Sequence, residues 1–251
     1  MTFGSLFAGI GGFDLGFERA GMVCKWQVEK DPYCLRVLEK HWPNVRRYED
    51  VKDVGKRNLE SVDVICGGFP CQPFSSNGGL RGKDDDRYLW PEFYRIVREV
   101  KPKWVVVENV TRLLSIDNGR IIGEILGKLA EGGYDKEWDC LPAVAFGALH
   151  QRDRLIIIAH AKHLGSCGGR QGQPQREHKK MGRGKQSRCD GGNRIMAERI
   201  KPMPTWRIEP GISRVANGVS YRVDRIRGLG NAIMPQVSEY IGRLIMQATL
   251  L

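Results

Sequence analysis

The stretch TFGSLFAGIGGFDLGFERA at residues 2–20 decides the fold class, because it joins a β-type run to a helix through a glycine-rich turn. We expect a strand over residues 2–7 and a helix over 13–20, with Gly-x-Gly-Gly at positions 9–12 between them. Glycines at this point allow a tight turn and a close approach of the backbone to a ligand. The spacing is not the dinucleotide pattern Gly-x-Gly-x-x-Gly, since position 14 is Asp.

Glu29 follows Gly9 by twenty residues, at the end of a second expected strand over 23–28. An acid in this place can accept hydrogen bonds from ribose hydroxyls, while the following helix N-terminus offers free N–H groups. The alternative is a glycine-rich surface turn with a solvated Glu. The residues favour an adenosine-containing cofactor, and they do not require phosphate binding.

The same alternation of β-type runs and helical stretches continues to about residue 160. Asp31 followed by Pro32 predicts the start of a helix over 32–41. Further strands are expected at 62–66, 104–107 and 155–159, and further helices at 89–100 and 121–130. Strands separated by helices of ten or more residues imply right-handed crossovers and a mostly parallel sheet. The fold class is therefore α/β.

Composition is that of an ordinary globular protein. The chain has 251 residues, 41% hydrophobic and 27% charged, which excludes a fibrous repeat, a wholly disordered chain and a disulfide-stapled miniprotein. No run approaches the 18 apolar residues of a membrane span, and the first residues lack the features of a signal peptide. The seven scattered cysteines are typical of reduced thiols. We expect a soluble protein located in the cytoplasm.

Positive charge is concentrated in one segment. The net charge is +11, and residues 162–207 contribute +9 of it through twelve basic and three acidic residues. Residues 163–192 also hold eight glycines and show no helical or alternating period. Such a block is either a polyanion-binding surface or a solvated, poorly ordered loop. Because apolar periodicity returns at 226–233 and 237–244, we expect one α/β domain from 1–162 and 221–251, interrupted by a basic region at 163–220.

A second motif, GGFPCQPFS at residues 67–75, follows the expected strand at 62–66. Cys71 would then lie beyond a carboxyl strand end, where open α/β sheets bind ligands, between Pro70 and Pro73, which restrict the backbone. A cysteine presented in this way is a candidate nucleophile. The cysteines at positions 24, 34, 66 and 140 lie in strand- or helix-like runs, and we expect most of them to be small buried hydrophobes.

Five blocks in this order resemble the cytosine-C5 DNA methyltransferase family: FAGIGG at 7–12, PCQ at 70–72, ENV at 108–110, QRDR at 151–154 and GNAIMP at 230–235. The resemblance covers about residues 3–160 and 221–243. It leaves out the basic region, which is where this family keeps its variable target-recognition region. It implies a Rossmann-like fold of the type that uses S-adenosylmethionine, and a DNA (cytosine-5-)-methyltransferase of bacterial or phage type acting on double-stranded DNA.

The resemblance also implies roles for individual residues. The thiolate of Cys71 would add to C6 of a flipped-out cytosine, and Glu108 would bond the N3/N4 edge of that base. Arg154 would contact the base near O2, with Arg152 beside it as support. The methyl group would pass to C5, leaving S-adenosylhomocysteine. The cofactor residues implied by the family are Phe7, Gly9, Gly11, Glu29, Asp50, Val51, Pro70 and Asn231.

Two positions depart from the family pattern. Position 5 is Ser where the family often has Asp, and position 30 is Lys where many members place an apolar or aromatic residue over the adenine. Neither departure removes a reacting group. Both are expected to weaken the affinity for the cofactor.

The motifs also bear on three alternative functions. An RNA-methylating branch of the same family typically carries Cys-Phe-Thr, which is absent, and a catalytically silent DNA-binding relative is disfavoured because Cys71, Glu108 and Arg154 are all present. An amino-methyltransferase would need an (Asp/Asn/Ser)-Pro-Pro-(Tyr/Phe) loop, which is also absent. We expect a monomer, and a cognate restriction enzyme is compatible with the interpretation without being required.

No metal is expected. The residues His163, Cys167, His178 and Cys189 lack the closely spaced pairs of a structural zinc site. The three consecutive acids at 84–86 cannot all face one ion, so a solvated loop is the better interpretation.

Overall fold

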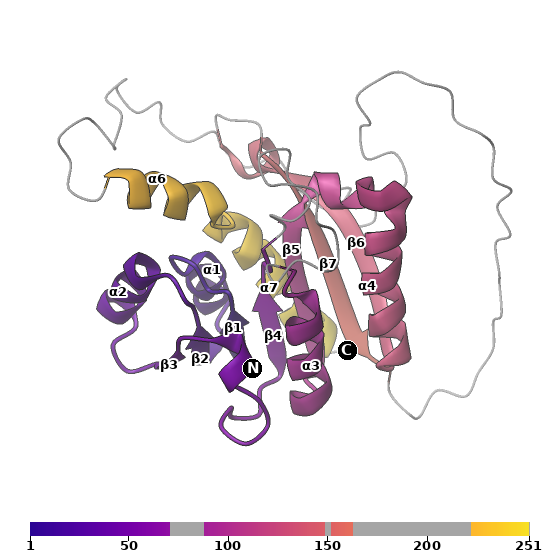
Figure 1. Cartoon of the computed structure of the whole chain (residues 1–251), viewed down its shortest axis with the longest axis horizontal. Helices are drawn as coiled ribbons and strands as arrows, with labels where there is room; N and C mark the ends of the chain where they lie inside the picture. Colours follow the sequence, from indigo (N-terminus) through magenta and orange to yellow (C-terminus); the bar gives the residue numbers. More distant parts are fainter. Residues whose placement is uncertain (71–87, 149–151, 163–221, 251) are drawn as a thin grey trace, which may run out of the picture.

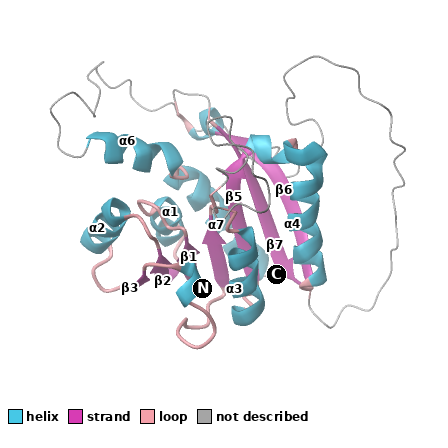
Figure 2. Cartoon of the chain, in the orientation of Figure 1, coloured by secondary structure: helices cyan, strands magenta, loops and turns pink. Residues whose placement is uncertain are grey.

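The computed structural model describes residues 1–70, 88–148, 152–162 and 222–250. One seven-stranded sheet with the order β3-β2-β1-β4-β5-β7-β6 forms its centre. Helices cover both faces of this sheet, with α1 and α7 on one side and α3 and α4 on the other (Figures 1 and 2). The strands are β1 Thr2–Leu6, β2 Val23–Val28, β3 Arg46–Tyr48, β4 Val64–Gly67, β5 Trp104–Val110, β6 Tyr134–Pro142 and β7 Asp153–Ala161. The helices are α1 Gly12–Arg19, α2 Pro32–His41, α3 Trp90–Val100, α4 Arg120–Glu131, α6 Arg222–Asn231 and α7 Pro235–Thr249.

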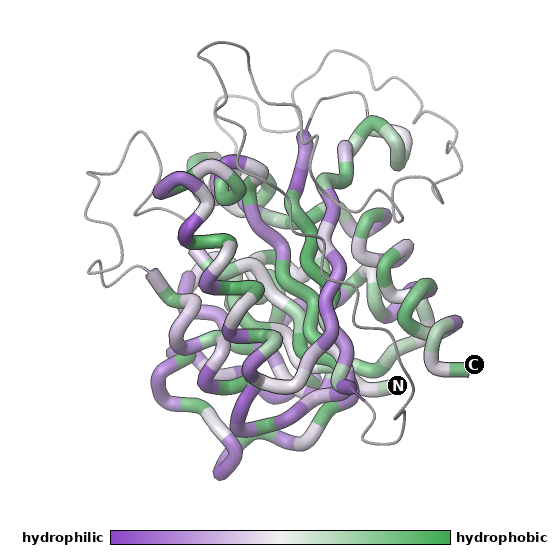
Figure 3. The backbone as a smooth tube through the Cα atoms, turned by 90° about the vertical axis from the view of Figure 1, so that its right-hand side faces the viewer, coloured by the Kyte–Doolittle hydropathy of each residue, from purple (hydrophilic) through white to green (hydrophobic). Residues whose placement is uncertain are grey.

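The central strands are apolar on both faces, as expected for strands covered by helices on two sides. In β5, Val105 and Val107 pack among the residues of α3 and α4, whereas Val106 packs with α1 and α7. β7 repeats the alternation, with Leu155 and Ile157 on the first side and Ile156 on the second. Figure 3 shows these hydrophobic stretches running through the middle of the molecule. This arrangement produces two cores separated by the sheet.

The sheet confirms the expected α/β class and the mostly parallel pairing. β1–β2, β2–β3, β1–β4 and β4–β5 are parallel, while β5–β7 and β6–β7 are antiparallel. The sequence did not predict β3 or β6. β3 has only three residues, and β6 lies at the edge of the sheet and reads YDKEWDCLP, so neither gives a strong apolar signal.

Most boundaries expected from the sequence lie within a few residues of those observed, and two agree fully. β2 and α2 begin and end where predicted, and the Asp31 side chain caps α2 by accepting from the N–H groups of Tyr33 and Cys34 at 2.9 and 3.1 Å. The strand expected at 104–107 was too short. β5 continues to Val110, so Glu108 and Asn109 are in the strand rather than after it, and both pair with β7.

The C-terminal segment packs on the first helix. Ser238 Oγ in α7 donates to the carbonyl of Gly12 at 2.8 Å. A Cβ at Gly16 would lie 2.0 Å from Ser238 Oγ, so the two helices can approach this closely only because position 16 has no side chain. Residues 163–221 lie outside the described residues, so the proposed division into an α/β domain and a basic region stays a prediction.

Beneath the glycine-rich turn, Asp14 is fully buried. Its carboxylate accepts from Gln27 Nε2 at 2.9 Å and from Ser5 Oγ at 3.2 Å, and Cys24 Sγ lies 3.5 Å away. Burial raises the pKa of Asp14 to about 6, although the hydrogen bonds from Gln27, Cys24 and Ser5 oppose that change. Ser5, one of the departures from the family pattern, is therefore a partner of a buried acid.

Asp14→Asn should remove a pH dependence of stability. The folded protein binds the Asp14 proton more tightly than the unfolded chain, where the pKa is near 3.8. The contribution of Asp14 to the free energy of unfolding is therefore greatest below pH 4, and it falls by about 2–3 kcal/mol as the pH rises through 6. Asn keeps the acceptor for Gln27, and its amide can donate to the Ser5 hydroxyl. In denaturant titrations from pH 4 to 8, the free energy of unfolding of Asp14→Asn should rise relative to that of the wild type by about 2–3 kcal/mol.

Asp135→Asn provides the matched control for this comparison. Asp135 is an exposed aspartate of β6 that pairs with Lys162 at 3.2 Å. Its replacement removes the same charge without touching a buried group. Stability curves for Asp14→Asn and wild type that stay parallel across this pH range would contradict the assignment.

Candidate active site

A cavity of about 740 Å³ opens beyond the carboxyl ends of β1, β2, β4 and β5. The strand order reverses at β1 and β4, which is where open α/β sheets bind ligands. The opposite wall consists of α6 and the residues that lead into α7. The site residues predicted from the sequence that line the cavity are Phe7, Gly9, Glu29, Asp50, Val51, Pro70, Glu108, Arg154 and Asn231.

The glycine-rich turn forms the floor of the cavity. Phe7 has a φ of 53°, an unusual value for a residue with a side chain, and its ring stacks on that of Phe93 with centroids 6.5 Å apart. Gly9 has a φ of 57° and lines the cavity. Gly11 does not line it. With a φ of 85° it is the N-cap residue of α1, and a Cβ there would lie 2.4 Å from the ring of Trp42. Gly11 is therefore needed for packing.

Glu29 joins the two loops that follow β1 and β2. Its Oε2 accepts from the Gly9 N–H at 2.7 Å, and its Oε1 accepts from the N–H groups of Lys30 and Asp31 at 2.9 and 2.7 Å. These bonds orient the carboxylate at the edge of the cavity. A carboxylate has about four acceptor positions, so capacity remains for a hydroxyl donor.

Asp50 lies at the rim next to Lys30. Its Oδ1 accepts from the Lys52 N–H at 3.0 Å, and its Oδ2 is 2.9 Å from Lys30 Nζ. The backbone N–H of Lys52 and then the Lys30 ammonium hold the pKa of Asp50 below its usual range. The Lys30 side chain is 80% exposed, so the ion pair is at the surface of the cavity. Val51 is buried behind it.

Glu108 and Arg154 form a pair at the other end of the cavity. Arg154 Nε lies 2.8 Å from Glu108 Oε1, because Glu108 pairs with Ile156 in the antiparallel ladder and Arg154 is its diagonal neighbour on β7. Glu108 is 8% exposed, and burial raises its pKa, opposed by Arg154 and Arg152. A Cβ at Gly68 would lie 2.6 Å from Glu108 Oε2, so Gly68 leaves room for the carboxyl group.

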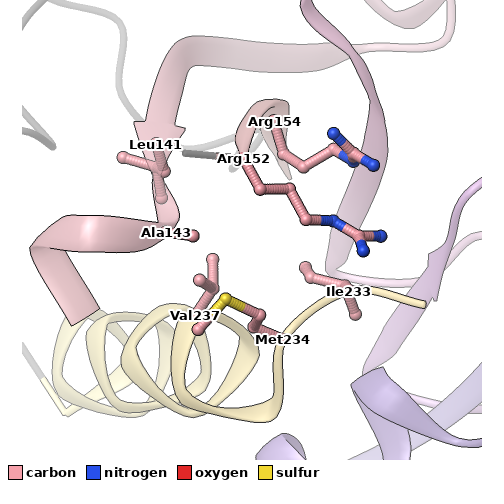
Figure 4. A pocket seen from close by; sticks show the side chains of 7 residues that line it. All are labelled: Leu141, Ala143, Arg152, Arg154, Ile233, Met234 and Val237. Atoms are coloured by element: carbon pink, nitrogen blue, oxygen red, sulfur yellow. The ribbon is translucent and has the colours of Figure 1, made fainter. Parts of the chain in front are cut away.

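Arg152 does not line this cavity. Its Nη1 and Nη2 donate to the carbonyls of Leu229 and Ala232 at 3.0 and 2.6 Å, which ties the start of β7 to the C-terminal block. Figure 4 shows Arg152 and Arg154 extending side by side, with Arg152 toward Ile233. Burial lowers the pKa of Arg152, and the neighbouring Arg154 adds to this effect. These contacts show Arg152 connecting two parts of the chain, Leu229 and Ala232 on one side and β7 on the other.

The sequence interpretation assigned no role to Asn109, which is buried beside Glu108. Its Nδ2 donates to the carbonyl of Phe69 at 3.1 Å, and its Oδ1 accepts from the Val110 N–H at 2.9 Å. Asn109 therefore fastens the segment that leads to Pro70. The ENV block at 108–110 contains Asn109 and could have indicated its role, but the sequence interpretation gave a role only to Glu108. Cys71 itself lies outside the described residues.

The family model for C-5 cytosine-specific DNA methylase matches residues 1–201 of this chain. The chain belongs to this family.

Named relatives agree with this assignment. The chain is 36% identical over 167 residues to the Type II methyltransferase M.HgiCII of Herpetosiphon aurantiacus, a match that covers 66% of this chain and 38% of that protein. It is 35% identical over 165 residues to the Type II methyltransferase M.HhaI of Haemophilus parahaemolyticus, covering 65% and 50% respectively. The chain thus spans half or less of the length of these curated relatives.

Solved structures show the same fold. A putative DNA modification methyltransferase encoded within an E. coli prophage has a TM-score of 0.56 and 29% identity, covering 64% of this chain and 47% of that one. The Spodoptera frugiperda DNMT2 variant has a TM-score of 0.56 at 20% identity, covering 68% and 53%. The expected Rossmann-like methyltransferase fold is confirmed.

Two further findings concern only the part of the chain that the structure describes. No group of three or more His, Cys, Asp or Glu side chains there is placed to hold a metal ion. None of the helices there is long and apolar enough to cross a membrane. The acids at 84–86 and the residues His163, Cys167, His178 and Cys189 lie outside the described ranges.

Proposed function

We propose that this chain catalyses transfer of a methyl group from S-adenosylmethionine to C5 of a cytosine in double-stranded DNA. The observation that carries the proposal is that one cavity joins Glu29 and Asp50 at one end to the Glu108–Arg154 pair at the other. A volume of about 740 Å³ lies in the range of small-molecule sites. A nucleoside-containing cofactor and the edge of a base can therefore face one another within it.

The residues at the first end suit an adenosine-containing cofactor. Glu29 would accept from the ribose hydroxyls, Asp50 would accept from the adenine amino group, and Phe7 and Val51 supply apolar surface. Asp50 would have to exchange its ion pair with Lys30 for the amino group. The cofactor, when bound, supplies an electrophilic methyl group. Pro70 and Asn231 would line the part of the cavity nearer the base.

The residues at the second end suit the activation of cytosine. In the proposed reaction the Cys71 thiolate forms a bond to C6 of the base, which makes C5 electron-rich. Glu108, whose pKa burial raises, would hold a proton at N3 and so neutralise the charge that develops there. Arg154 would bond the base near O2. After methylation at C5, a general base takes the C5 proton and the bond between C6 and sulfur breaks, which releases Cys71 as a thiolate and restores the aromatic ring.

The proposal extends to the partner and the setting. A basic region at 163–220 would contact the phosphates of the DNA and read its sequence, and the target cytosine would be flipped out of the duplex. We propose that the enzyme acts as a monomer in the cytoplasm of a bacterial host, either alone or beside a cognate restriction enzyme.

Methylation-sensitive sequencing of DNA from an expressing host tests the function directly. The DNA should contain 5-methylcytosine in a defined sequence context. Expression of Cys71→Ala should leave the same sites unmodified. An absence of 5-methylcytosine in DNA from cells that contain folded wild-type protein would refute the proposal.

Glu29→Ala should weaken binding of S-adenosylmethionine by roughly 1–3 kcal/mol, because the hydrogen bonds of the ribose hydroxyls to a charged acceptor would be lost. Isothermal titration calorimetry measures the change. Glu39→Ala, which removes an exposed acid from α2 outside the cavity, is the matched control and should bind like the wild type. Equal affinity of Glu29→Ala and the control for S-adenosylmethionine would contradict the assignment of Glu29 to the ribose.

A further inference from the structure

The helix α6 forms one wall of the cavity but has little buried surface of its own. Of the α6 residues whose burial the structure describes, only Gly228 is buried. The side chains of Val223 and Leu229 are 73% and 55% exposed. By contrast, α7 buries Val237, Ile241 and Ile245 among the residues of the sheet. Elements with few buried apolar contacts open at a low free-energy cost. The residues of α6 whose side chains the structure describes are therefore held in place mainly by polar contacts.

The placement of α6 determines the width of the cavity. Arg227, Gly228 and Asn231 line the cavity opposite the loop of Glu29 and Asp31. At Gly228 the helix rests on the turn and on α2, since a Cβ there would lie 3.0 Å from Ile10 Cγ2 and 3.6 Å from Tyr33 Cε1. In Figure 1, α6 crosses above α2 and α1 before the chain enters α7.

The two ends of α6 are fastened differently. At the C-terminal end, Arg152 donates to the carbonyls of Leu229 and Ala232, and Ile233 is buried just beyond them. Further toward the N-terminus, Arg227 Nη2 forms an ion pair with Asp31 Oδ2, and Asp31 also caps α2 through its Oδ1. The side chains of Arg227 and Asp31 are 55% and 24% exposed, so this contact is a partly solvated one that can break and re-form.

We propose that α6 is a hinged wall that turns about residues 231–234, and that the ion pair of Arg227 with Asp31 holds it closed across the cavity. Arg227 is then a positioning residue for the cofactor, because it places the wall rather than the reacting atoms. The inference about the cofactor rests on the proposed function, whereas the movement of α6 does not.

Hydrogen exchange of the ligand-free protein tests the movement. Arg227 also pairs with Asp224 within α6 at 3.4 Å, a contact that Asp31→Asn leaves in place. Asp31→Asn and Arg227→Gln should each raise the exchange rates of the amides in residues 222–231 by about two- to five-fold, the range for loss of an exposed ion pair. Arg243→Gln is the matched control, since it removes an ion pair with Glu239 at 2.8 Å on α7 and leaves α6 untouched. Equal exchange of α6 in Arg227→Gln and in the control would overturn the proposal.

Stopped-flow binding of S-adenosylhomocysteine tests the consequence for the cavity. In Arg227→Gln, the rate constants for association and dissociation should both rise by about two- to five-fold, because the wall must open for either event. Asp31→Asn keeps the cap of α2 but removes the charge, so it should give the same rates, and the double variant should add nothing further.

The outcomes separate the two proposals. An increase confined to dissociation would overturn the hinged wall and make Arg227 a direct cofactor ligand. If the wild-type protein does not bind S-adenosylhomocysteine, the proposed function fails, and hydrogen exchange of α6 still decides whether the wall moves.

Discussion

Cys71→Ala is expected to reduce methyl transfer by at least about 10⁴-fold, because the alanine methyl group cannot add to C6 of the base. The substitution should lower the rate of the methyl-transfer step without changing the fold or the binding of the cofactor. Cys71 follows a segment that Asn109 holds through a hydrogen bond to the carbonyl of Phe69, and this bond does not involve the thiol. Single-turnover transfer of a labelled methyl group to DNA measures the loss, and cofactor affinity should remain unchanged. Transfer at the wild-type rate would contradict covalent catalysis by Cys71.

A target cytosine with fluorine at C5 should trap the wild-type enzyme. After methyl transfer no proton remains at C5 to be removed, so the bond between C6 and sulfur persists through denaturing electrophoresis. Formation of this adduct should require S-adenosylmethionine and should vanish in Cys71→Ala. Cys140→Ala is the matched control, because Cys140 lies in the edge strand β6, and it should trap normally.

Mass spectrometry of the trapped peptide identifies the attacking thiol. Cys34 also lines the cavity, but burial raises its pKa to about 12, so it stays a poorly reactive thiol at neutral pH. Attachment of the base at Cys34, or at any cysteine other than Cys71, would overturn the mechanism.

Glu108→Gln should slow methyl transfer by about 10²- to 10⁴-fold, the usual contribution of a positioned acid. The amide has nearly the same volume and its oxygen can still accept from Arg154, so the fold should be retained. It cannot deliver a proton to N3 of the base. The trapping reaction should slow to a similar degree. In the wild type, deprotonation of Glu108 should lower the rate of methyl transfer as the pH rises, and this pH dependence should be absent in Glu108→Gln.

Glu137→Gln is the matched control for this variant, because Glu137 is an exposed acid of the edge strand β6 that does not line the cavity. It should transfer methyl groups at the wild-type rate. Thermal unfolding of both variants shows whether they are folded. A Glu108→Gln enzyme as fast as this control would remove Glu108 from the proposed chemistry.

The first half of the fold and the place of the cavity could be predicted from the sequence alone. The run over residues 2–20, the β2 strand and the Asp31–Pro32 start of α2 were predictable because their signals are local: apolar period, glycine spacing and helix capping. The motifs at the carboxyl ends of β1, β2, β4 and β5 then placed Phe7, Glu29, Pro70 and Glu108 around one site.

The positions and charges of the remaining groups depend on contacts that form only when the chain folds. β6 and the antiparallel direction of β7 depend on pairing between strands, which no local pattern encodes, and this pairing brings Arg154 to Glu108. Arg227 meets Asp31 across 196 residues of sequence, and Arg152 meets the carbonyl of Leu229 across 77. The raised pKa of Asp14 likewise depends on burial beneath a turn. Burial and long-range contact exist only in the folded chain, and they set the charge and position of these groups.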